Sequence, residues 1–241
     1  MKWFIPMLHR AAILGFLLIT MWCIARAALS DARTNIGSMT LTNANSAGSL
    51  SALLNEVSKV KPDALVMDMR GGLVELTLEP RFVSDENLVL ISNCSSLQKL
   101  TLFGSDSKEV FSSKGIQQLS VLTNLHTLTL MCGRRLKPGV LEAITTLTNL
   151  SALALLGTDP EIPEFQSLTR MTNLAELRVA YAMNLGDGDL ASLTNIPFLR
   201  RIEFRSAKLT TNSLAIIPKF SFATNVYIGS QEWRTNRIVT Q

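Results

Sequence analysis

Few residues of this sequence combine a type and a spacing that could do chemistry. His126 follows an apolar residue in a strand-like segment, and no Ser or Cys near it has the surroundings of a nucleophile. The chain contains none of the motifs GxSxG, HExxH, CxxC and GxxxxGK[ST], which carry hydrolysis, zinc binding, redox exchange and phosphate binding. The sequence therefore predicts a protein that is not an enzyme and that uses no metal and no cofactor.

Asp187 and Asp189 form a tight pair of carboxylates, on either side of Gly188. Their oxygens could in principle hold a hard cation such as Ca²⁺. The pair also stands directly before Leu190, the first of a set of apolar residues at helical spacing, and acidic side chains are favoured where a helix begins. We interpret the pair as a turn and helix start rather than as a metal site.

The charge balance argues against a nucleic-acid partner. The chain has 23 basic and 19 acidic residues, which gives a net charge of +4. Lys2, Arg10 and Arg26 lie in the first 27 residues, which contain no acid, so the remainder holds 20 basic and 19 acidic residues. A surface this close to neutral lacks the electrostatic attraction that dominates binding to phosphate backbones.

The N-terminus has the layout of an export signal. Basic residues precede an uninterrupted apolar run, Ala11 to Ala25, and Ala25-Arg26-Ala27 places small residues where a signal peptidase reads them. The run is shorter than the roughly 20 residues that cross a bilayer as a helix. We predict a signal peptide over residues 1–27, a linker over 28–47, and a periplasmic, cell-surface or secreted protein. An uncleaved membrane anchor over residues 3–25 remains the alternative.

The rest of the chain is a repeat with a period near 25 residues. Each copy has apolar residues at its first, fourth and sixth positions, which predicts a short strand. The copies are LVELTL from Leu73, LQKLTL from Leu97, LHTLTL from Leu125, LSALAL from Leu150, LAELRV from Leu174, LRRIEF from Leu199 and the degenerate ATNVYI from Ala223.

Between the strands, triplets of apolar residues spaced by three predict one buried face of a short helix. Ser84, Ser112 and Thr210 are expected to start helices, and Lys137-Pro138 fits an N-cap followed by Pro in the first turn. The triplets are Leu88/Ile91/Cys94, Ile116/Leu119/Leu122, Leu141/Ile144/Leu147, Phe165/Leu168/Met171, Leu190/Leu193/Ile196 and Leu214/Ile217/Phe220. An Asn before the next strand, at Asn124, Asn149 and Asn173, is expected to close the helix in the left-handed conformation.

A strand and a helix of this size cannot bury their apolar faces alone, so successive units must stack. The LxxLxL pattern at this period resembles the leucine-rich repeat. Segments such as LGDGDLASLTNIPFL are similar to the repeats of exported bacterial proteins and to the cysteine-containing repeats of F-box-type ubiquitin-ligase receptors. The resemblance implies an α/β repeat, a right-handed solenoid with a parallel sheet on its concave face and short helices on its convex face.

The domain organisation follows from this repeat. We expect an N-terminal cap over residues 48–72, about seven repeats over 73–230, and a C-terminal tail or cap over 231–241 in which Trp233, Ile238 and Val239 cover the open end. The family usually places Asn or Cys eight residues after each strand leucine. Here that position holds Arg81, Ser105, Gly133, Thr158, Ala182 and Ala207, so the polar ladder of the family is mostly missing.

The remaining cysteines fit a core rather than a bridge. Cys94 occupies the register of Leu122 and Leu147, whereas Cys132 lies beyond the opposite end of a strand. Two thiols at opposite ends of a repeat are too far apart for a disulfide, so the sequence predicts two buried free thiols.

Strand alternation predicts which side chains face the concave side: those two, four and six residues after each strand leucine. The middle strands carry apolar residues there and the outer strands carry charges, a combination typical of a protein contact site. The candidate binding residues are Phe103, Thr127, Thr129, Met131, Leu156, Arg178, Arg201, Arg205 and Tyr227.

The function that this pattern favours is a non-catalytic exported module that binds a protein, or a glycan, through its concave face. A membrane-anchored structural protein of the envelope is one alternative. An intracellular ubiquitin-ligase substrate adaptor is another, suggested by repeat subtype alone, and it would require an adaptor-binding domain that residues 1–47 do not show.

Overall fold

The computed structural model describes residues 44–104, 111–132, 136–229 and 237–240. The predicted signal peptide, Trp233, and Ser105 and Gly133 of the expected polar ladder lie outside the described residues. Among the described residues no helix is both long and apolar enough to span a bilayer.

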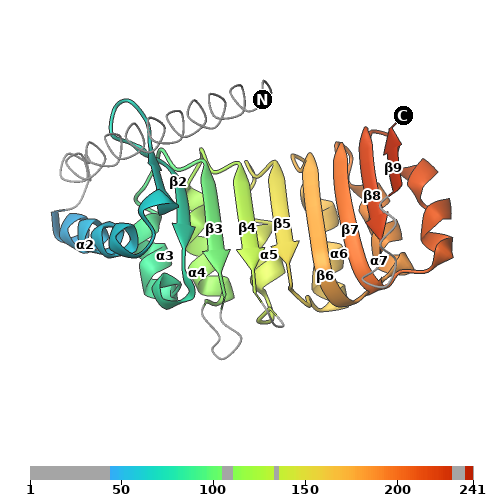
Figure 1. The fold of residues 1–241 in the computed structure, drawn as a ribbon, viewed down its shortest axis with the longest axis horizontal. Helices are drawn as coiled ribbons and strands as arrows, with labels where there is room; N and C mark the ends of the chain where they lie inside the picture. Colours follow the sequence, from blue (N-terminus) through green and yellow to red (C-terminus); the bar gives the residue numbers. More distant parts are fainter. Residues whose placement is uncertain (1–43, 105–110, 133–135, 230–236, 241) are drawn as a thin grey trace, which may run out of the picture.

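All described strands belong to one sheet in which strand order follows chain order, from β1 to β9 (Figure 1). The pairs from β2 to β8 are parallel, whereas β1 and β9 are antiparallel to their neighbours. The strands are β1 Leu65–Met67, β2 Leu73–Leu78, β3 Lys99–Phe103, β4 Thr127–Met131, β5 Ala152–Leu156, β6 Glu176–Gly186, β7 Arg201–Lys208, β8 Asn225–Gly229 and β9 Arg237–Thr240.

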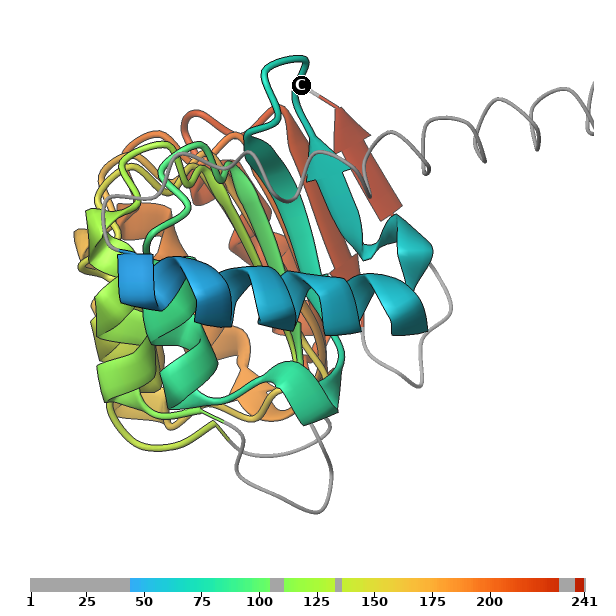
Figure 2. The same ribbon diagram turned by 90° about the vertical axis from the view of Figure 1, so that its left-hand side faces the viewer.

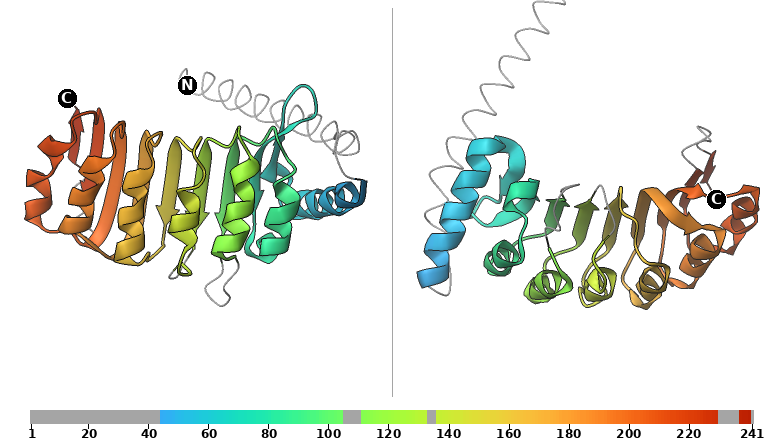
Figure 3. Two further views of the ribbon diagram at one scale, coloured as in Figure 1. Left: turned by 180° about the vertical axis from the view of Figure 1, so that it is seen from behind. Right: turned by 90° about the horizontal axis from the view of Figure 1, so that it is seen from below.

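The helices between the strands all lie on one side of this sheet, along the outside of a shallow arc (Figure 3). One strand and one helical segment per repeat, stacked in this order, is the leucine-rich-repeat solenoid that the sequence predicted. The α-helices are α2 Ala44–Val60, α3 Asp85–Ile91, α4 Ser113–Gln118, α5 Val140–Ile144, α6 Ile162–Ser167 and α7 Asp187–Ser192. Short 3-10 helices are η2 Pro62–Ala64, η3 Pro80–Phe82, η4 Leu119–Val121, η5 Leu168–Arg170, η6 Leu193–Asn195, η7 Thr211–Ala215 and η8 Ile217–Lys219.

The core is built from rows of equivalent apolar residues that pair strand to strand. One row runs across all seven parallel strands, and none of its members is more than 3% exposed. It consists of Leu76, Leu100, Leu128, Leu153, Leu177, Ile202 and Val226. Burying each such side chain stabilises the fold by about 1.5–3 kcal/mol, so the leucine spacing is what sets the register of the sheet.

The predicted helix starts are confirmed at three places. The side-chain oxygens of Ser84, Ser112 and Thr210 accept hydrogen bonds from backbone N–H groups in the first turn. Asp85 then accepts hydrogen bonds from Ser112 of the following unit, through both the backbone N–H at 2.8 Å and the hydroxyl at 2.6 Å. Neighbouring helices are therefore tied together at their N-terminal ends.

The expected N-cap at Lys137-Pro138 is wrong. Helix α5 begins after Gly139, whose left-handed backbone (φ 82°) turns the chain into the helix. The Gly139 N–H is bound by Glu164 Oε1 of the next unit at 2.6 Å. A left-handed glycine with a carboxylate acceptor replaces the hydroxyl cap used elsewhere.

The expectation that asparagines close the helices in the left-handed conformation is also wrong. Among the described residues Tyr181 is the one non-glycine residue with a positive φ. The three asparagines instead donate hydrogen bonds from their side chains to carbonyls of the preceding unit: Asn124 to Ser95, Asn149 to Thr123 and Asn173 to Thr148.

The N-terminal end of the core is covered by α2, which lies across it (Figure 2). Leu50, Leu54 and Val57 of α2 are fully buried in the common core. The helix begins at Ala44, so it includes the last residues of the segment predicted as linker. Strand β1 follows, and the turn from Asp68 to Gly72 leads into β2.

In the last unit the prediction fails for Leu214, which is 43% exposed. This unit winds as the 3-10 helices η7 and η8, and a 3-10 helix has three residues per turn. The tighter winding turns Ser213 inward in place of Leu214, and Ile217 and Phe220 remain buried as predicted. Strand β9 extends the sheet beyond β8 by antiparallel pairing.

Candidate functional site

The concave face of the sheet presents three parallel rows of side chains, one row for each outward-facing position of the strands. Direct neighbours in a row lie one strand spacing apart, about 4.8 Å. The first row runs Glu75, Lys99, Thr127, Ala152, Glu176, Arg201 and Asn225; the second Thr77, Thr101, Thr129, Ala154, Arg178, Glu203 and Tyr227; the third Phe103, Met131, Leu156, Ala180, Arg205 and Gly229.

The third row brings three apolar candidates together. Phe103 pairs with Met131, and Met131 pairs with Leu156. Met131 is 36% exposed, while Phe103 and Leu156 are half-buried. The ammonium group of Lys61, from the N-terminal cap, lies 5.6 Å from the centre of the Phe103 ring. We call Phe103, Met131 and Leu156 the apolar row.

Thr127 and Thr129 lie beside the apolar row on β4, both half-buried. They give the centre of the concave face hydroxyl groups next to apolar side chains. Tyr227 lies on β8, opposite Glu203 in the register, and is therefore four strands away from Thr129. The candidate residues thus form one surface, with the threonines at its centre and Tyr227 at its margin.

Tyr181 is a further exposed residue, next in sequence to a member of the third row, that alternation could not reveal. Counting along β6 assigns Tyr181 to the core side, together with Leu177 and Val179. A bulge interrupts β6 between Ala180, which pairs with Arg205, and Ala182, which pairs with Ser206.

The bulged residue has φ 62° and its side chain is 59% exposed, and it comes directly after Ala180, a member of the third row. Met183, two residues later, is exposed as well. A left-handed backbone at a residue with a Cβ costs about 1–2 kcal/mol, and no feature of the sequence marks this position.

Charged side chains occupy the concave face on β6 and β7 and are arranged in ion pairs. Arg178 Nε lies 2.6 Å from Glu203 Oε2, and Arg205 Nε lies 3.1 Å from Glu203 Oε1. Arg201 Nη1 lies 3.1 Å from Glu176 Oε2. The three candidate arginines are therefore held in place by two glutamates of the same face.

Asp187 and Asp189 take structural roles in the first turn of α7. Asp189 Oδ2 accepts a hydrogen bond from the Gly186 N–H at 2.8 Å. Asp187 accepts hydrogen bonds from the backbone N–H and the hydroxyl of Thr210 in the following unit. Both carboxylates accept hydrogen bonds within the fold, which agrees with their interpretation as a helix start. The described residues hold no group of three His, Cys, Asp or Glu side chains placed to bind a metal.

The two described cysteines are free, as predicted, but only Cys94 is fully buried, and Cys132 is half-buried. Burial raises the pKa of the Cys94 thiol to about 12. Burial also raises the pKa of Cys132 to about 11, against the opposing effect of a hydrogen bond from the Gly104 backbone. Thiols with such pKa values stay protonated and are poor nucleophiles near neutral pH.

His126 is exposed at the start of β4, and its Nδ1 lies 3.3 Å from the carbonyl oxygen of Asn149. The imidazole therefore contacts a backbone group of the neighbouring unit rather than a nucleophilic side chain.

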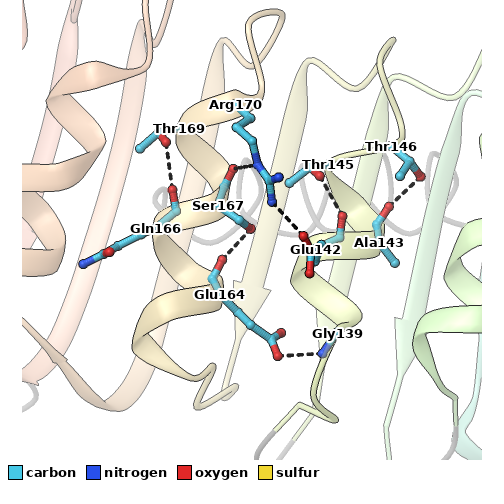
Figure 4. A network of polar contacts seen from close by, with 10 residues as sticks. All are labelled: Gly139, Glu142, Ala143, Thr145, Thr146, Glu164, Gln166, Ser167, Thr169 and Arg170. Carbon is cyan, nitrogen blue, oxygen red and sulfur yellow. Dashed lines mark hydrogen bonds and ion pairs between the residues drawn. The ribbon is translucent and has the colours of Figure 1, made fainter.

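The helix side of the solenoid is polar and satisfies many of its own polar groups. Arg170 donates to Glu142 of the preceding unit at 3.2 Å, and Thr145 and Thr146 donate to carbonyls of their own helical segment (Figure 4). Ser167 and Thr169 do the same one unit later.

No protein-family model and no curated protein matches the sequence. The structure is similar to an internalin, InlF, from Listeria monocytogenes, at 16% identity and a TM-score of 0.43, over 71% of this chain and 55% of that chain. It is also similar to internalin C2 of the same species, at 15% identity and a TM-score of 0.38, over 68% of this chain and 67% of that one.

A third similar structure is the leucine-rich-repeat ectodomain of the receptor kinase GASSHO1/SCHENGEN3 from Arabidopsis thaliana, in complex with CASPARIAN STRIP INTEGRITY FACTOR 2. The identity is 14% and the TM-score 0.38, over 73% of this chain and 20% of that chain. The chain thus spans about half the length of InlF and a smaller part of the plant ectodomain. Identities this low indicate nothing about the ligand.

Proposed function

We propose that this leucine-rich-repeat chain is an exported, non-catalytic module that binds a protein partner, or a glycan, through its concave face. The observation that carries the proposal is the apolar row. Three large apolar side chains from three adjacent strands lie side by side on an accessible face, next to threonines and ion-paired arginines. Contiguous apolar groups with a polar surround are typical of contact surfaces.

The contrast with the helix side supports this choice of face. There the exposed apolar residues, such as Val89 and Val121, stand on different units among threonines and ion pairs. On the concave side, register pairing makes the apolar side chains direct neighbours, and the exposed Tyr181 and Met183 follow closely after Ala180, the register partner of Leu156.

The carboxylates and thiols that could do chemistry have structural roles or stay protonated, which supports a function without catalysis. The carboxylates of Asp187 and Asp189 hold the turn between two units, and the thiols of Cys94 and Cys132 are kept protonated by burial. Export is supported by the apolar run Ala11 to Ala25 with its preceding basic residues.

The binding test replaces two members of the apolar row with charge. Met131→Glu combined with Leu156→Glu should abolish capture of a partner from the extracellular fraction of the native host. The circular dichroism spectrum should stay unchanged, because both side chains face solvent at least in part. The matched control is Val89→Glu with Val121→Glu, which adds the same charge to exposed apolar sites of the helix side and should leave capture intact. Capture that survives the first pair would refute the concave site.

The test of export is the intact mass and N-terminal sequence of the protein from each cell fraction. A chain that begins near Ala28 outside the cytoplasm is expected. A full-length chain in the membrane fraction would instead favour the anchored envelope protein, and a full-length cytosolic chain would favour the intracellular adaptor.

A further inference from the structure

We propose that Arg178 and Arg205 together bind one side-chain carboxylate of the partner, so that the partner segment carries an acidic residue close to large apolar side chains. This inference rests on the proposed concave binding function and names the chemistry of its partner. The evidence is the way in which the two arginines share one glutamate.

Glu203 lies between the two guanidinium groups, with Oε2 2.6 Å from Arg178 Nε and Oε1 3.1 Å from Arg205 Nε. Its side chain is 15% exposed, so its carboxylate is largely covered, whereas Arg178 and Arg205 are 47% and 36% exposed. A guanidinium group has five N–H donors, four of them on the terminal nitrogens. Within the described part of the chain, no hydrogen bond uses the terminal nitrogens of these two arginines.

The local charge balance favours an anion at this place. On β6 and β7 the concave face carries three arginines and two glutamates, and Arg201 already uses Glu176. One carboxylate therefore serves two guanidinium groups, which leaves a surplus of one positive charge. At the Phe103 end of the apolar row, Lys99 and Glu75 form an ion pair at 2.6 Å, and the Lys61 ammonium lies over the Phe103 ring. A single carboxylate matches the surplus, whereas a phosphate ester with nearly two charges would exceed it.

The position of the arginines fits a segment that also covers the apolar row. Leu156, Ala180 and Arg205 are consecutive register partners on β5, β6 and β7. Two strand spacings, about 10 Å, separate Leu156 from Arg205, and an extended chain covers that distance in about three residues. Next to Arg205 the register partner on β8 is Gly229, which has no side chain to cover the guanidinium group.

The sheet continues past the arginines into β8 and β9, so a bound segment can run on in that direction. For this reason the carboxylate is assigned to an Asp or Glu side chain rather than to a chain end. The partner motif is therefore an extended segment with one or more large apolar side chains and an acidic side chain about three residues away.

The test selects peptides from a random dodecapeptide library in which every peptide is fused through its C-terminus, so that all free carboxylates are side chains. The full chain and Arg178→Met/Arg205→Met are the two targets. Arg→Met keeps most of the aliphatic stem and removes the charge. The triple variant Arg178→Met/Glu203→Gln/Arg205→Met keeps the test valid if an unpaired Glu203 impairs folding. Lys99→Met, on the same face beyond the apolar row, is the matched control.

The expected result is that the unmodified chain and the Lys99→Met control enrich peptides with an acidic residue near large apolar residues. The arginine variants should enrich apolar peptides without the acidic residue. A selected acidic peptide should bind the arginine variants roughly 10- to 100-fold more weakly, the size expected for losing charge-assisted hydrogen bonds.

Three outcomes overturn the inference and leave the proposed function standing. In the first, all targets enrich the same apolar peptides without acidic residues. In the second, acidic peptides are enriched but bind the arginine variants as tightly as they bind the unmodified chain. In the third, no peptide is enriched, and this inference alone is overturned. If selected peptides still bind Met131→Glu/Leu156→Glu, the concave site itself fails, and this inference fails with it.

Discussion

Asn149 Nδ2 donates a hydrogen bond of 2.9 Å to the carbonyl oxygen of Thr123 in the preceding unit. Asn124 and Asn173 make the equivalent bonds one unit earlier and one unit later. The solenoid therefore does have a ladder of polar side chains between its units, but on the turn that enters each strand. The ladder ends where Phe198 and Phe222 occupy this position, with their ring centres 5.9 Å apart.

Removal of one member of this ladder should weaken the contact between two units. Asn149→Ala is expected to lower the free energy of unfolding by about 1 kcal/mol, because the Thr123 carbonyl loses its donor while water replaces part of the interaction. Urea denaturation measures the change. Asn212→Ala is the control, since that side chain is exposed and makes no hydrogen bond among the described residues. Equal losses in the two variants would contradict the role of the ladder.

Gly104 is required by the close approach of Cys132. A Cβ at Gly104 would lie 2.7 Å from Cys132 Sγ and 3.1 Å from its Cα. Gly104→Ala should therefore lower the free energy of unfolding by about 1–3 kcal/mol. The double variant with Cys132→Ala removes the closest atom, so its loss should be smaller than the sum of the two single losses in urea denaturation. Strictly additive losses would show that the two residues do not clash.

The raised pKa values of the Cys94 and Cys132 thiols predict a defined reactivity and pH dependence. In a Cys23→Ser chain, a thiol reagent at pH 8 should leave Cys94 and Cys132 unmodified until guanidinium unfolds the protein. The unfolded thiols lose their protons above a pKa of about 8.5. The folded thiols keep theirs up to about 12 and 11, so between these values the unfolded state binds fewer protons and stability falls as pH rises.

The control for this pH dependence is the chain with Cys94→Ala and Cys132→Ala. Other groups titrate in the same alkaline range, so the measured quantity is the difference between the two chains in the slope of unfolding free energy against pH. The cysteine-containing chain should lose stability more steeply above pH 9. Rapid labelling of the native protein would contradict burial of the thiols.

The repeat register could be predicted from the sequence because each strand leucine and each helix triplet contributes the same burial in every unit. A shift of one residue would expose a whole row of leucines, so the pattern allows one register alone. The rows of the concave face follow from that register, and the placement of Phe103, Met131 and Leu156 as direct neighbours agrees with it.

Features that depend on local backbone or side-chain conformation could not be predicted from the sequence pattern. Leu214 has the right type for the core, but the 3-10 winding of its unit turns it outward. The N-terminal turn of α5 depends on Glu164 of another unit, which accepts the Gly139 N–H. The sharing of Glu203 by two arginines depends on side-chain conformations across two strands. In the last two cases the deciding contact is between units, where a pattern within one unit carries no information.

The bulge at Tyr181 connects the fold to the proposed binding surface. Its left-handed backbone strains any residue with a Cβ, so Tyr181→Gly should be more stable than Tyr181→Ala by about 1 kcal/mol, the reverse of the usual order in a strand. Urea denaturation of the two variants measures this difference. Both variants remove the exposed ring beside the apolar row, and both should weaken partner capture to a similar extent.

The two readouts for Tyr181 separate strain from contact. If Tyr181→Gly gained stability and kept full capture, the ring would lie outside the binding surface. If Tyr181→Ala were the more stable variant, the left-handed conformation would carry no strain. We expect Tyr181→Gly to be the more stable variant and both variants to lose capture. This result would mean that the backbone strain at Tyr181 is a cost of presenting its ring to the partner.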